Sequence, residues 1–388
     1  MPVNFDKYVE RRGTDCVKYD FAVERGKPAD VLPLWIADMD FRIPEQVTQA
    51  LIKRCEHGIF GYSDTKEDYF LALENWFKTN HNWQVEPQWL VKTPGVVFAF
   101  FMAIRAFTNE GDSVIIQQPV YHPFEAGIKA NNRNMVISRL LYKDGRYQMD
   151  YEDFEDKVIK NKVKLFIACN PHNPVGRVWT KEELEKIGDI CIKHNVLIVS
   201  DEIHQDFIYK GHKHIVFASI KPEFSQNTIT CTAPSKTFNI AGLQASNIFI
   251  ANKDIRRKFK TEIIKTGYGE INPLGAIACK TAYNEGRDWL DQLLVYLNGN
   301  FDFLRSFLKE KMPQVKLVEP DGTYVAWLDF SGLGLSADQL DDIITNKAKL
   351  WLDPGRKFGE GGDQFQRINM ACPRSTLKEA LEKLANAF

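Results

Sequence analysis

The chain has 388 residues, which is enough for two domains, because single hydrophobic cores rarely grow beyond about 250–300 residues. It is 44% hydrophobic and 26% charged, and its 50 basic and 51 acidic residues leave a formal net charge of −1. The basic excess typical of nucleic-acid and anionic-membrane binders is therefore missing, so we expect no nucleic acid, no membrane and a small-molecule partner.

The first seven residues carry no basic-then-apolar leader, and no apolar run approaches the ~20 residues that a spanning helix needs. We therefore expect a cytoplasmic protein.

The seven cysteines are odd in number and widely spaced, without the C-x-x-C spacing of zinc or redox sites. They are expected to be reduced and mostly buried thiols, and no metal site is predicted.

Three parts follow one another along the chain. Residues 1–45 are irregular and punctuated by proline, residues 46–288 form a predicted large domain, and residues 289–388 form a predicted small α+β domain. No internal repeat, low-complexity tract or Ser/Gly linker separates them, so these limits depend on changes of pattern.

The large domain alternates short apolar runs with longer amphipathic stretches. The runs predict buried strands of a mainly parallel sheet at 113–116, 164–169, 196–200, 228–231 and 247–250. Between the second and third runs, Thr180 and Glu183 have the spacing of a capping box and predict a helix start. This alternation is typical of an α/β fold.

The last hundred residues have a different pattern. Residues 315–318 and 324–328 alternate like strands, while 337–349 and 375–387 predict helices. We expect a smaller lobe that combines a sheet with helices.

Three polar side chains follow strand ends in the predicted sheet, where open α/β sheets bind ligands: Asn173, Asp201 and Lys236. A lysine amine can form a Schiff base with the aldehyde of pyridoxal 5'-phosphate (PLP), an aspartate can keep its pyridine nitrogen protonated, and an amide can reach its phenolic oxygen. Each residue alone also fits an ordinary role: a solvated lysine, a helix-capping aspartate or an Asn-Pro turn.

A phosphate site is predicted where an apolar helical stretch begins. The N–H groups of Gly95, Val96 and Val97 lie at that start, where a dianion is favoured by free donors and by the helix dipole. Ser235, beside Lys236, can add a hydroxyl group.

Five longer motifs accompany these residues, at 33–41, 118–124, 235–243, 322–330 and 367–374. Together they resemble the fold-type I PLP enzymes, and within them cystathionine β-lyase and related carbon–sulfur lyases of the MalY and PatB type. The resemblance covers essentially the whole chain. It implies the aspartate aminotransferase-like fold of PLP-dependent transferases, with a mainly parallel seven-stranded sheet in the large domain. It also implies that residues 1–45 join the small domain at the edge of the site.

The same resemblance implies roles near the cofactor. Tyr121 would stack on its ring, and Tyr62 would reach across a homodimer interface into a shared active site. His204 replaces a tyrosine of many aminotransferases, and we expect it to hydrogen-bond near the cofactor rather than to catalyse. Gln244 stands where aminotransferases usually carry an arginine, eight residues after Lys236.

Substrate-binding residues are predicted in the same way. Arg367 has the guanidinium fork that suits an amino-acid carboxylate, a role that the resemblance also implies. Asn173 and Tyr62 are expected to contact the substrate as well. Trp35, Ala37 and Tyr324 are expected to line the pocket, although aromatic residues are more often part of a core.

These residues lead to a predicted reaction. Lys236, Asp201 and Tyr121 would catalyse α,β-elimination of L-cystathionine, L-cysteine or an S-substituted cysteine to pyruvate, ammonia and a thiol or hydrogen sulfide, with Lys236 as base. Two alternatives stay open. One is an aminotransferase for aromatic or apolar amino acids; the other is a regulatory surface, for which the sequence offers no identifiable apolar patch.

Overall fold

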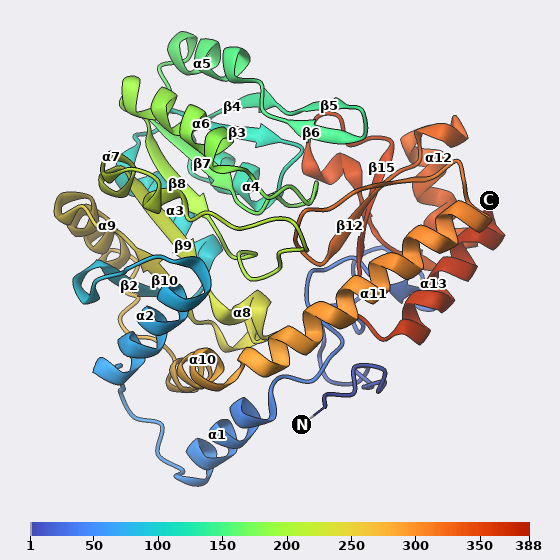
Figure 1. Ribbon diagram of the computed structural model, residues 1–388, viewed down its shortest axis with the longest axis horizontal. Helices are drawn as coiled ribbons and strands as arrows, with labels where there is room; N and C mark the ends of the chain where they lie inside the picture. The colour runs from blue at the N-terminus through green and yellow to red at the C-terminus, as the bar shows by residue number, and fades with distance from the viewer. Residues whose placement is uncertain (1) are drawn as a thin grey trace.

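The computed structural model describes residues 2–388, and a seven-stranded sheet lies at its centre in the order β2-β10-β9-β8-β7-β3-β4 (Figure 1). Only β10 runs antiparallel to its neighbours, β2 and β9. The strands are β2 (Leu90–Thr93), β3 (Ser113–Gln118), β4 (Asn134–Arg139), β7 (Leu165–Cys169), β8 (Leu197–Asp201), β9 (Thr228–Thr232) and β10 (Ser246–Phe249). The predicted α/β fold with a mainly parallel sheet is confirmed.

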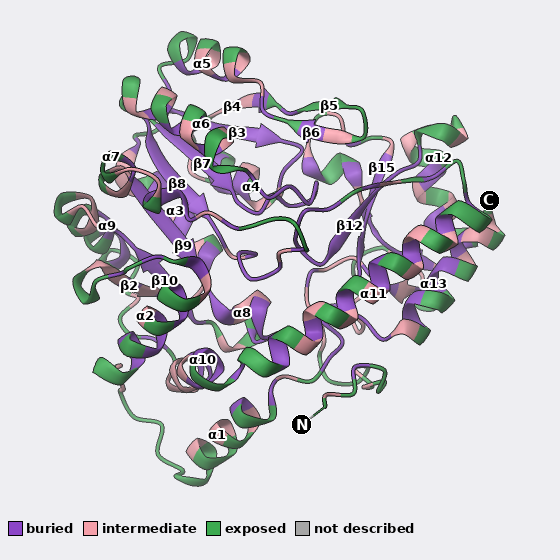
Figure 2. Ribbon diagram, viewed as in Figure 1, coloured by how far each residue is buried: buried purple, intermediate pink, exposed green. Residues whose placement is uncertain are grey.

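Helices cover both faces of this sheet because alternate strand residues point to opposite sides. Ile116 and Ile167 belong to the core beneath α3 and α9, whereas Ile115 and Phe166 belong to the core beneath α5 and α6. Figure 2 shows the central strands buried and the outer helix faces exposed. The covering helices are α3 (Val96–Phe107), α4 (Pro123–Ala130), α5 (Tyr151–Lys160), α6 (Lys181–Lys193), α7 (Pro222–Gln226) and α9 (Lys253–Ile264).

Helix α6 begins as predicted. The hydroxyl of Thr180 accepts a hydrogen bond from the Glu183 backbone, and the Glu183 carboxylate accepts one from the Thr180 backbone. This capping box fixes the crossover from β7 to β8.

The C-terminal part contains a four-stranded antiparallel sheet in the order β11-β12-β15-β14. Its strands are β11 (Lys316–Val318), β12 (Val325–Asp329), β14 (Asp353–Pro354) and β15 (Phe365–Asn369). Helices α11 (Arg287–Lys311) and α13 (Arg374–Ala387) pack beside each other (Figure 1).

The predicted helix at 337–349 is only partly α-helical. Helix α12 covers Ala337–Asp342, and a π-helical turn follows at Ile343–Lys347. The Ala348 N–H bonds to the Ile343 carbonyl, five residues back, and Lys349 adopts a left-handed φ of 55°. The turn thereby directs the chain into strand β13.

Residues 2–44 are irregular, as predicted, except for a two-residue strand. Strand β1 (Leu32–Pro33) pairs in parallel with β13 (Leu350–Trp351), so the N-terminal segment joins the C-terminal part of the chain. The remaining elements are α1 (Glu45–Glu56), α2 (Glu67–His81), α8 (Pro234–Thr237), α10 (Pro273–Glu285), β5 (Leu141–Lys143) and β6 (Arg146–Gln148). The domain limits at 45 and 288 stay predictions.

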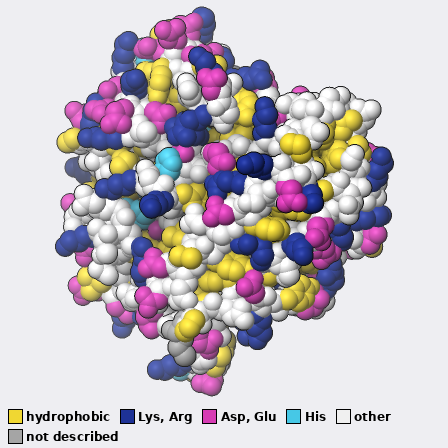
Figure 3. Space-filling view, turned by 45° about the vertical axis from the view of Figure 1, so that its right-hand side comes forward, with side chains coloured by type: hydrophobic (Ala, Val, Ile, Leu, Met, Phe, Trp, Pro, Cys, Tyr) yellow, Lys and Arg dark blue, Asp and Glu magenta, His cyan; other side chains and the backbone are white. Residues whose placement is uncertain are grey.

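The surface is mixed in charge. Basic and acidic side chains are interspersed over the face in Figure 3, without a continuous basic area. Among residues 2–388, none of the helices combines the length and the apolar character that crossing a bilayer requires.

Candidate active site

A cavity of about 420 Å³ opens beyond the carboxyl ends of β7, β8 and β9. The structure brings almost all predicted site residues into its wall: Trp35, Ala37, Gly95, Val96, Val97, Tyr121, Asn173, Asp201, His204, Ser235, Lys236 and Arg367. A volume of this size suits a cofactor together with a small substrate. The individual roles of these residues stay predictions.

Lys236 lies in the short helix α8, directly after β9. Its ammonium group donates a 2.6 Å hydrogen bond to the carbonyl oxygen of Ala37. Burial lowers the pKa of Lys236 to about 8; Arg367 acts in the same direction, while the carboxylates of Asp38 and Asp201 oppose it. A lysine with this pKa is readily deprotonated near neutral pH, as a nucleophile or a base requires.

Asp201 is the last residue of β8 and is buried. Its carboxyl group accepts one hydrogen bond, of 3.1 Å, from the Ile203 backbone. Burial raises the pKa of Asp201 to about 7, although that hydrogen bond and Lys236 favour the carboxylate. A protonated ring nitrogen placed beside this group would stabilise its charged form.

Arg367, on β15, is buried and ordered by three contacts. It donates hydrogen bonds to the side-chain oxygen of Asn173 (3.0 Å) and to the carbonyl oxygen of Trp35 (2.7 Å), and it pairs with the Asp353 carboxylate. Its Nε has no partner among residues 2–388. The guanidinium is therefore held in place with one donor to spare.

His204 and Tyr121 are neutral groups in the cavity wall. Burial lowers the pKa of His204 to about 3, assisted by Lys236 and Arg367, and its Nδ1 has no hydrogen-bond partner within the described chain. Burial, assisted by Asp201, raises the pKa of Tyr121 to about 12. At neutral pH an unprotonated imidazole and a protonated phenol face the cavity.

The opposite end of the cavity is formed by the start of α3. Its first backbone N–H groups have no carbonyl partner in the helix, as at any helix N-terminus. A side chain at Gly95 would meet no atom within 4 Å, so the approach to these donors is open. Ser235 and Gln244 complete this end, and Gln244 supplies no positive charge.

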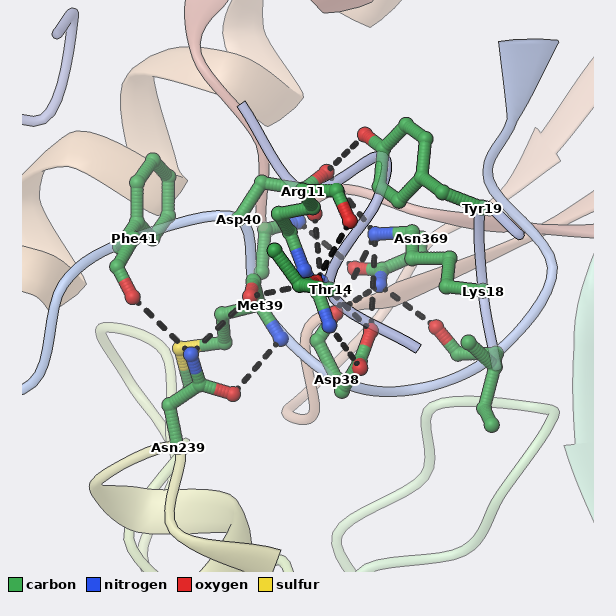
Figure 4. Close-up of polar contacts among 12 residues, drawn as sticks. Arg11, Thr14, Lys18, Tyr19, Asp38, Met39, Asp40, Phe41, Asn239 and Asn369 are labelled. Carbon is green, nitrogen blue, oxygen red and sulfur yellow. Dashed lines mark hydrogen bonds and ion pairs between the residues drawn. The ribbon is translucent and has the colours of Figure 1, made fainter. Parts of the chain in front are cut away.

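Ile36 and Ala37 line the cavity, and the segment 36–41 to which they belong is clamped from both sides. Asn239 exchanges hydrogen bonds with the Met39 backbone and donates to the Phe41 carbonyl. Asn369 donates to the carbonyl oxygens of Ile36 and Asp38. Figure 4 shows this segment between the two asparagines, which follow Lys236 by three residues and Arg367 by two.

Behind this segment lies a group of charged residues, which we term the N-terminal charge cluster: Arg11, Lys18, Asp38 and Asp40 (Figure 4). Lys18 is fully buried, and its ammonium lies 2.9 Å from Asp40 and 3.6 Å from Asp38. Arg11 contacts the same two carboxylates, at 2.7 and 2.6 Å. Because each buried charge has opposite charges beside it, the irregular segment can be held in one conformation.

A buried network also supports the residue after Lys236. Asp206 accepts hydrogen bonds from Thr237 (2.6 Å), His81 (2.9 Å) and Trp76 (3.1 Å). Burial by itself would raise the pKa of Asp206, but these hydrogen bonds hold that pKa below its usual range. Helix α8 is therefore fixed to α2 through a carboxylate.

Two tyrosines named from the sequence do not line this cavity, and for Tyr62 the predicted role across a dimer interface stays a prediction. Tyr62 is fully exposed on the segment between α1 and α2 and does not line the cavity of this chain. The expectation that Tyr324 lines the pocket is wrong, because its ring is buried behind the wall and its hydroxyl donates to the Ala37 carbonyl.

Several cavity residues were not predicted from the sequence. Asp353 pairs with Arg367, and Arg25 and His122 also lie in the wall. Asp353 can be recognised as a site residue only from the pairing of β14 with β15, in which it lies opposite Arg367. Arg25 lies in an irregular segment that offers no periodicity.

Residues 29–384 match the model of aminotransferase class I and II. The chain belongs to this family. The chain is 46% identical to cystathionine beta-lyase PatB of Bacillus subtilis (strain 168), over 100% of both chains.

Solved structures agree. A PLP-bound protein from Clostridium difficile 630 has a TM-score of 0.97 and 46% identity, and covers 100% of both chains. The PLP-bound C-S lyase from Staphylococcus hominis has a TM-score of 0.93 and 32% identity, and covers 100% of this chain and 98% of that one. The predicted resemblance to fold-type I PLP enzymes of the C–S lyase group is thereby confirmed.

The residues of this chain fit PLP. A half-buried lysine of lowered pKa, a buried carboxylate with a single donor and open helix-start N–H groups converge on one cavity. They match the aldehyde, the ring nitrogen and the phosphate of the cofactor, respectively.

Proposed function

We propose that this protein is a PLP-dependent carbon–sulfur β-lyase that cleaves cysteine-type amino acids to pyruvate, ammonia and a thiol or hydrogen sulfide. The observation that carries the proposal is the convergence of Lys236, Asp201 and Arg367 on one cavity, in a chain similar throughout to cystathionine β-lyase PatB. L-Cystathionine, L-cysteine and S-substituted cysteines are the proposed substrates.

Each residue has a task in this reaction. PLP, when bound, supplies an electron sink for the substrate α-carbon. Lys236 would hold the cofactor through its aldehyde and would act as the base that removes the substrate α-proton. Asp201 holds a proton on the ring nitrogen, and Arg367 orients the substrate through its carboxylate. The C–S bond then breaks with its electron pair on sulfur, which takes the proton carried by Lys236, and water converts the remaining three-carbon product to pyruvate and ammonia.

Positioning follows from the described contacts. Because Arg367 is fixed by Asn173, Trp35 and Asp353, a carboxylate on it is held at a constant distance from Lys236. Neutral His204 and protonated Tyr121 add hydrogen-bonding groups without adding charge beside the reacting atoms.

We further propose that the enzyme is a homodimer with shared active sites. Tyr62 lies on an exposed segment with two other large apolar side chains, Ile59 and Phe60. Such a group of exposed apolar residues is typical of a protein–protein interface. A partner seated there would bring its Tyr62 to this cavity.

We also propose that the protein is cytoplasmic, since all seven cysteines are free thiols.

A second function is favoured by one observation. The family model is that of aminotransferases, and the similar Clostridium difficile structure carries an aminotransferase name. The same lysine, aspartate and arginine would serve transamination, in which the amino group passes to an acceptor 2-oxo acid and no sulfur is expelled.

The test is a substrate panel. The purified PLP-loaded protein is incubated separately with L-cystathionine, L-cysteine and S-methyl-L-cysteine, and pyruvate and free thiol or sulfide are measured together. Equal amounts of both products support β-elimination and rank the three substrates. Absence of both products with all three substrates would reject the proposal.

A further inference from the structure

Arg25 is a cavity residue without an anionic partner. It lies in the cavity wall and is exposed, whereas Lys236 lies deeper and is half-buried. Its guanidinium lies over the ring of Trp35 in a cation–π contact, with 5.4 Å between the guanidinium carbon and the ring centroid. Within residues 2–388 its side chain makes no hydrogen bond and no ion pair. Its donors therefore stay available to a ligand.

Trp35 fixes the position of this guanidinium. Its ring stacks on Trp351, with 4.4 Å between centroids and 10° between planes, and its Nε1 donates to the Lys18 carbonyl. Its own carbonyl oxygen accepts a hydrogen bond from Arg367. Trp35 thus contacts two cationic side chains, Arg367 inside the cavity and Arg25 at its rim.

The acids of the cavity do not neutralise Arg25. Asp353 is already paired with Arg367 and with Lys357, the latter at 3.2 Å. Asp201 lies buried at the end of β8. Lys357 adds a further positive charge near the rim, 5.9 Å from the Trp35 ring. The mouth of the cavity therefore favours an anion.

Apolar side chains line the cavity together with the two cationic groups. Val17, Trp35 and Ile36 lie in the same wall, and Val17 is exposed. An aliphatic chain with a thioether can lie against such a surface, since burying its methylene groups is favourable. Its length would carry a terminal group from the inner site toward the rim.

We propose that Arg25 is a specificity residue that binds a carboxylate at the far end of the leaving group. The inference rests on the proposed lyase function and narrows it to S-substituted cysteines whose thiol half carries an anionic group. This guanidinium is well suited to the role, because its planar fork can bind a carboxylate in a bidentate manner while the indole attracts the cation.

The test compares two substrates that differ in one charge. The holoenzyme is assayed for thiol release from S-(3-carboxypropyl)-L-cysteine and from its neutral amide, S-(3-carbamoylpropyl)-L-cysteine. We expect the wild type to prefer the carboxylate in kcat/KM by about tenfold, the size of one charge-assisted contact. In Arg25→Met the ratio falls to about one, through KM for the carboxylate, and Arg25→Lys restores part of it.

Arg12→Met is the matched control. Arg12 lies on the same segment and also stacks on an aromatic ring, that of Tyr19 at 5.3 Å, but it does not line the cavity. The substrate preference should persist in this variant. Equal cleavage of both substrates by the wild type, or an unchanged ratio in Arg25→Met, would overturn the inference while leaving the lyase function intact. L-Cystathionine is assayed beside them, and release of no thiol from any of the three substrates would remove the proposed function itself.

Discussion

The amine of Lys236 donates a 2.6 Å hydrogen bond to the carbonyl oxygen of Ala37, which lies 199 positions earlier in the chain. The hydroxyl of Tyr324 donates to the same oxygen at 2.8 Å. Ala37 lies in the segment clamped by Asn239 and Asn369. The proposed catalytic lysine is thus placed by the N-terminal segment as well as by its own helix.

Replacing Lys236 by alanine removes the only group proposed to bond covalently to PLP. We expect loss of the visible absorption band of the PLP–lysine linkage and a fall in turnover of at least about 10³-fold, in line with the loss of an anchor and base. Circular dichroism should show a retained fold. Lys258→Ala, an exposed lysine on α9, is the control, and normal turnover by Lys236→Ala would refute the mechanism.

Asp201→Asn should stabilise the cofactor-free protein at high pH. With a pKa of about 7 when folded and 3.8 as the ordinary value, the folded state binds more protons between these limits. The free energy of unfolding of the wild type therefore falls as pH rises from about 4 to about 7, at up to about 1.4 kcal/mol per pH unit. Asparagine does not titrate, so the free energy of unfolding of the variant lacks this decrease with pH.

Urea unfolding at pH 4 to 8 checks this. The free energy of unfolding of Asp201→Asn should increase relative to that of the wild type as pH rises, and the difference should stay constant above pH 7. The exposed control variant Asp363→Asn should show no such pH-dependent difference. A difference between wild type and Asp201→Asn that does not vary with pH would show that burial does not perturb this carboxyl group. With PLP, the same variant should lose activity because the ring nitrogen loses its anionic partner.

Arg367→Lys keeps the charge but not the geometry. A single ammonium cannot maintain the contacts to Asn173, Trp35 and Asp353 and also bind a carboxylate in a bidentate manner. We expect KM for the amino acid to rise about 10- to 100-fold, with a smaller change in kcat. Steady-state kinetics measures both, with the surface variant Arg305→Lys for comparison; an unaltered KM would exclude carboxylate binding by Arg367.

Lys18→Met tests the N-terminal charge cluster. The change leaves Asp40 buried with one fewer cation, and loss of one partner of a buried ion pair costs about 3–5 kcal/mol. We expect a lower urea midpoint and faster proteolysis within the first 40 residues. Lys7→Met, an exposed lysine on the same segment, should change neither. A wild-type midpoint in Lys18→Met would show that the cluster does not stabilise the segment.

Features with a local cause could be predicted from the sequence. The capping box of Thr180 and Glu183 spans four residues and needs no knowledge of the rest of the chain. The apolar strands of the central sheet likewise carry their signal in their own composition. Since ligands bind where parallel strands end, the placement of Asn173, Asp201 and Lys236 in one cavity followed from the same pattern.

Features that depend on tertiary contacts could not be predicted. Asp353 becomes a partner of Arg367 only because β14 pairs with β15 in a register that sets these two residues opposite each other. Arg25 reaches the cavity because an irregular segment is held by buried charges, and no periodicity marks such a segment. The π-helical turn at Ile343–Lys347 precedes β13, whose partner β1 lies more than 300 residues earlier in the chain, so no local pattern marks this arrangement.

The partition between elimination and transamination tests the central claim most directly. The PLP-loaded enzyme is given L-cystathionine together with an aromatic 2-oxo acid as amino acceptor, and pyruvate, free thiol and the new aromatic amino acid are quantified in one reaction. The lyase account predicts pyruvate and thiol in equal amounts and almost no new amino acid. Formation of the aromatic amino acid without thiol release would contradict it and establish an aminotransferase.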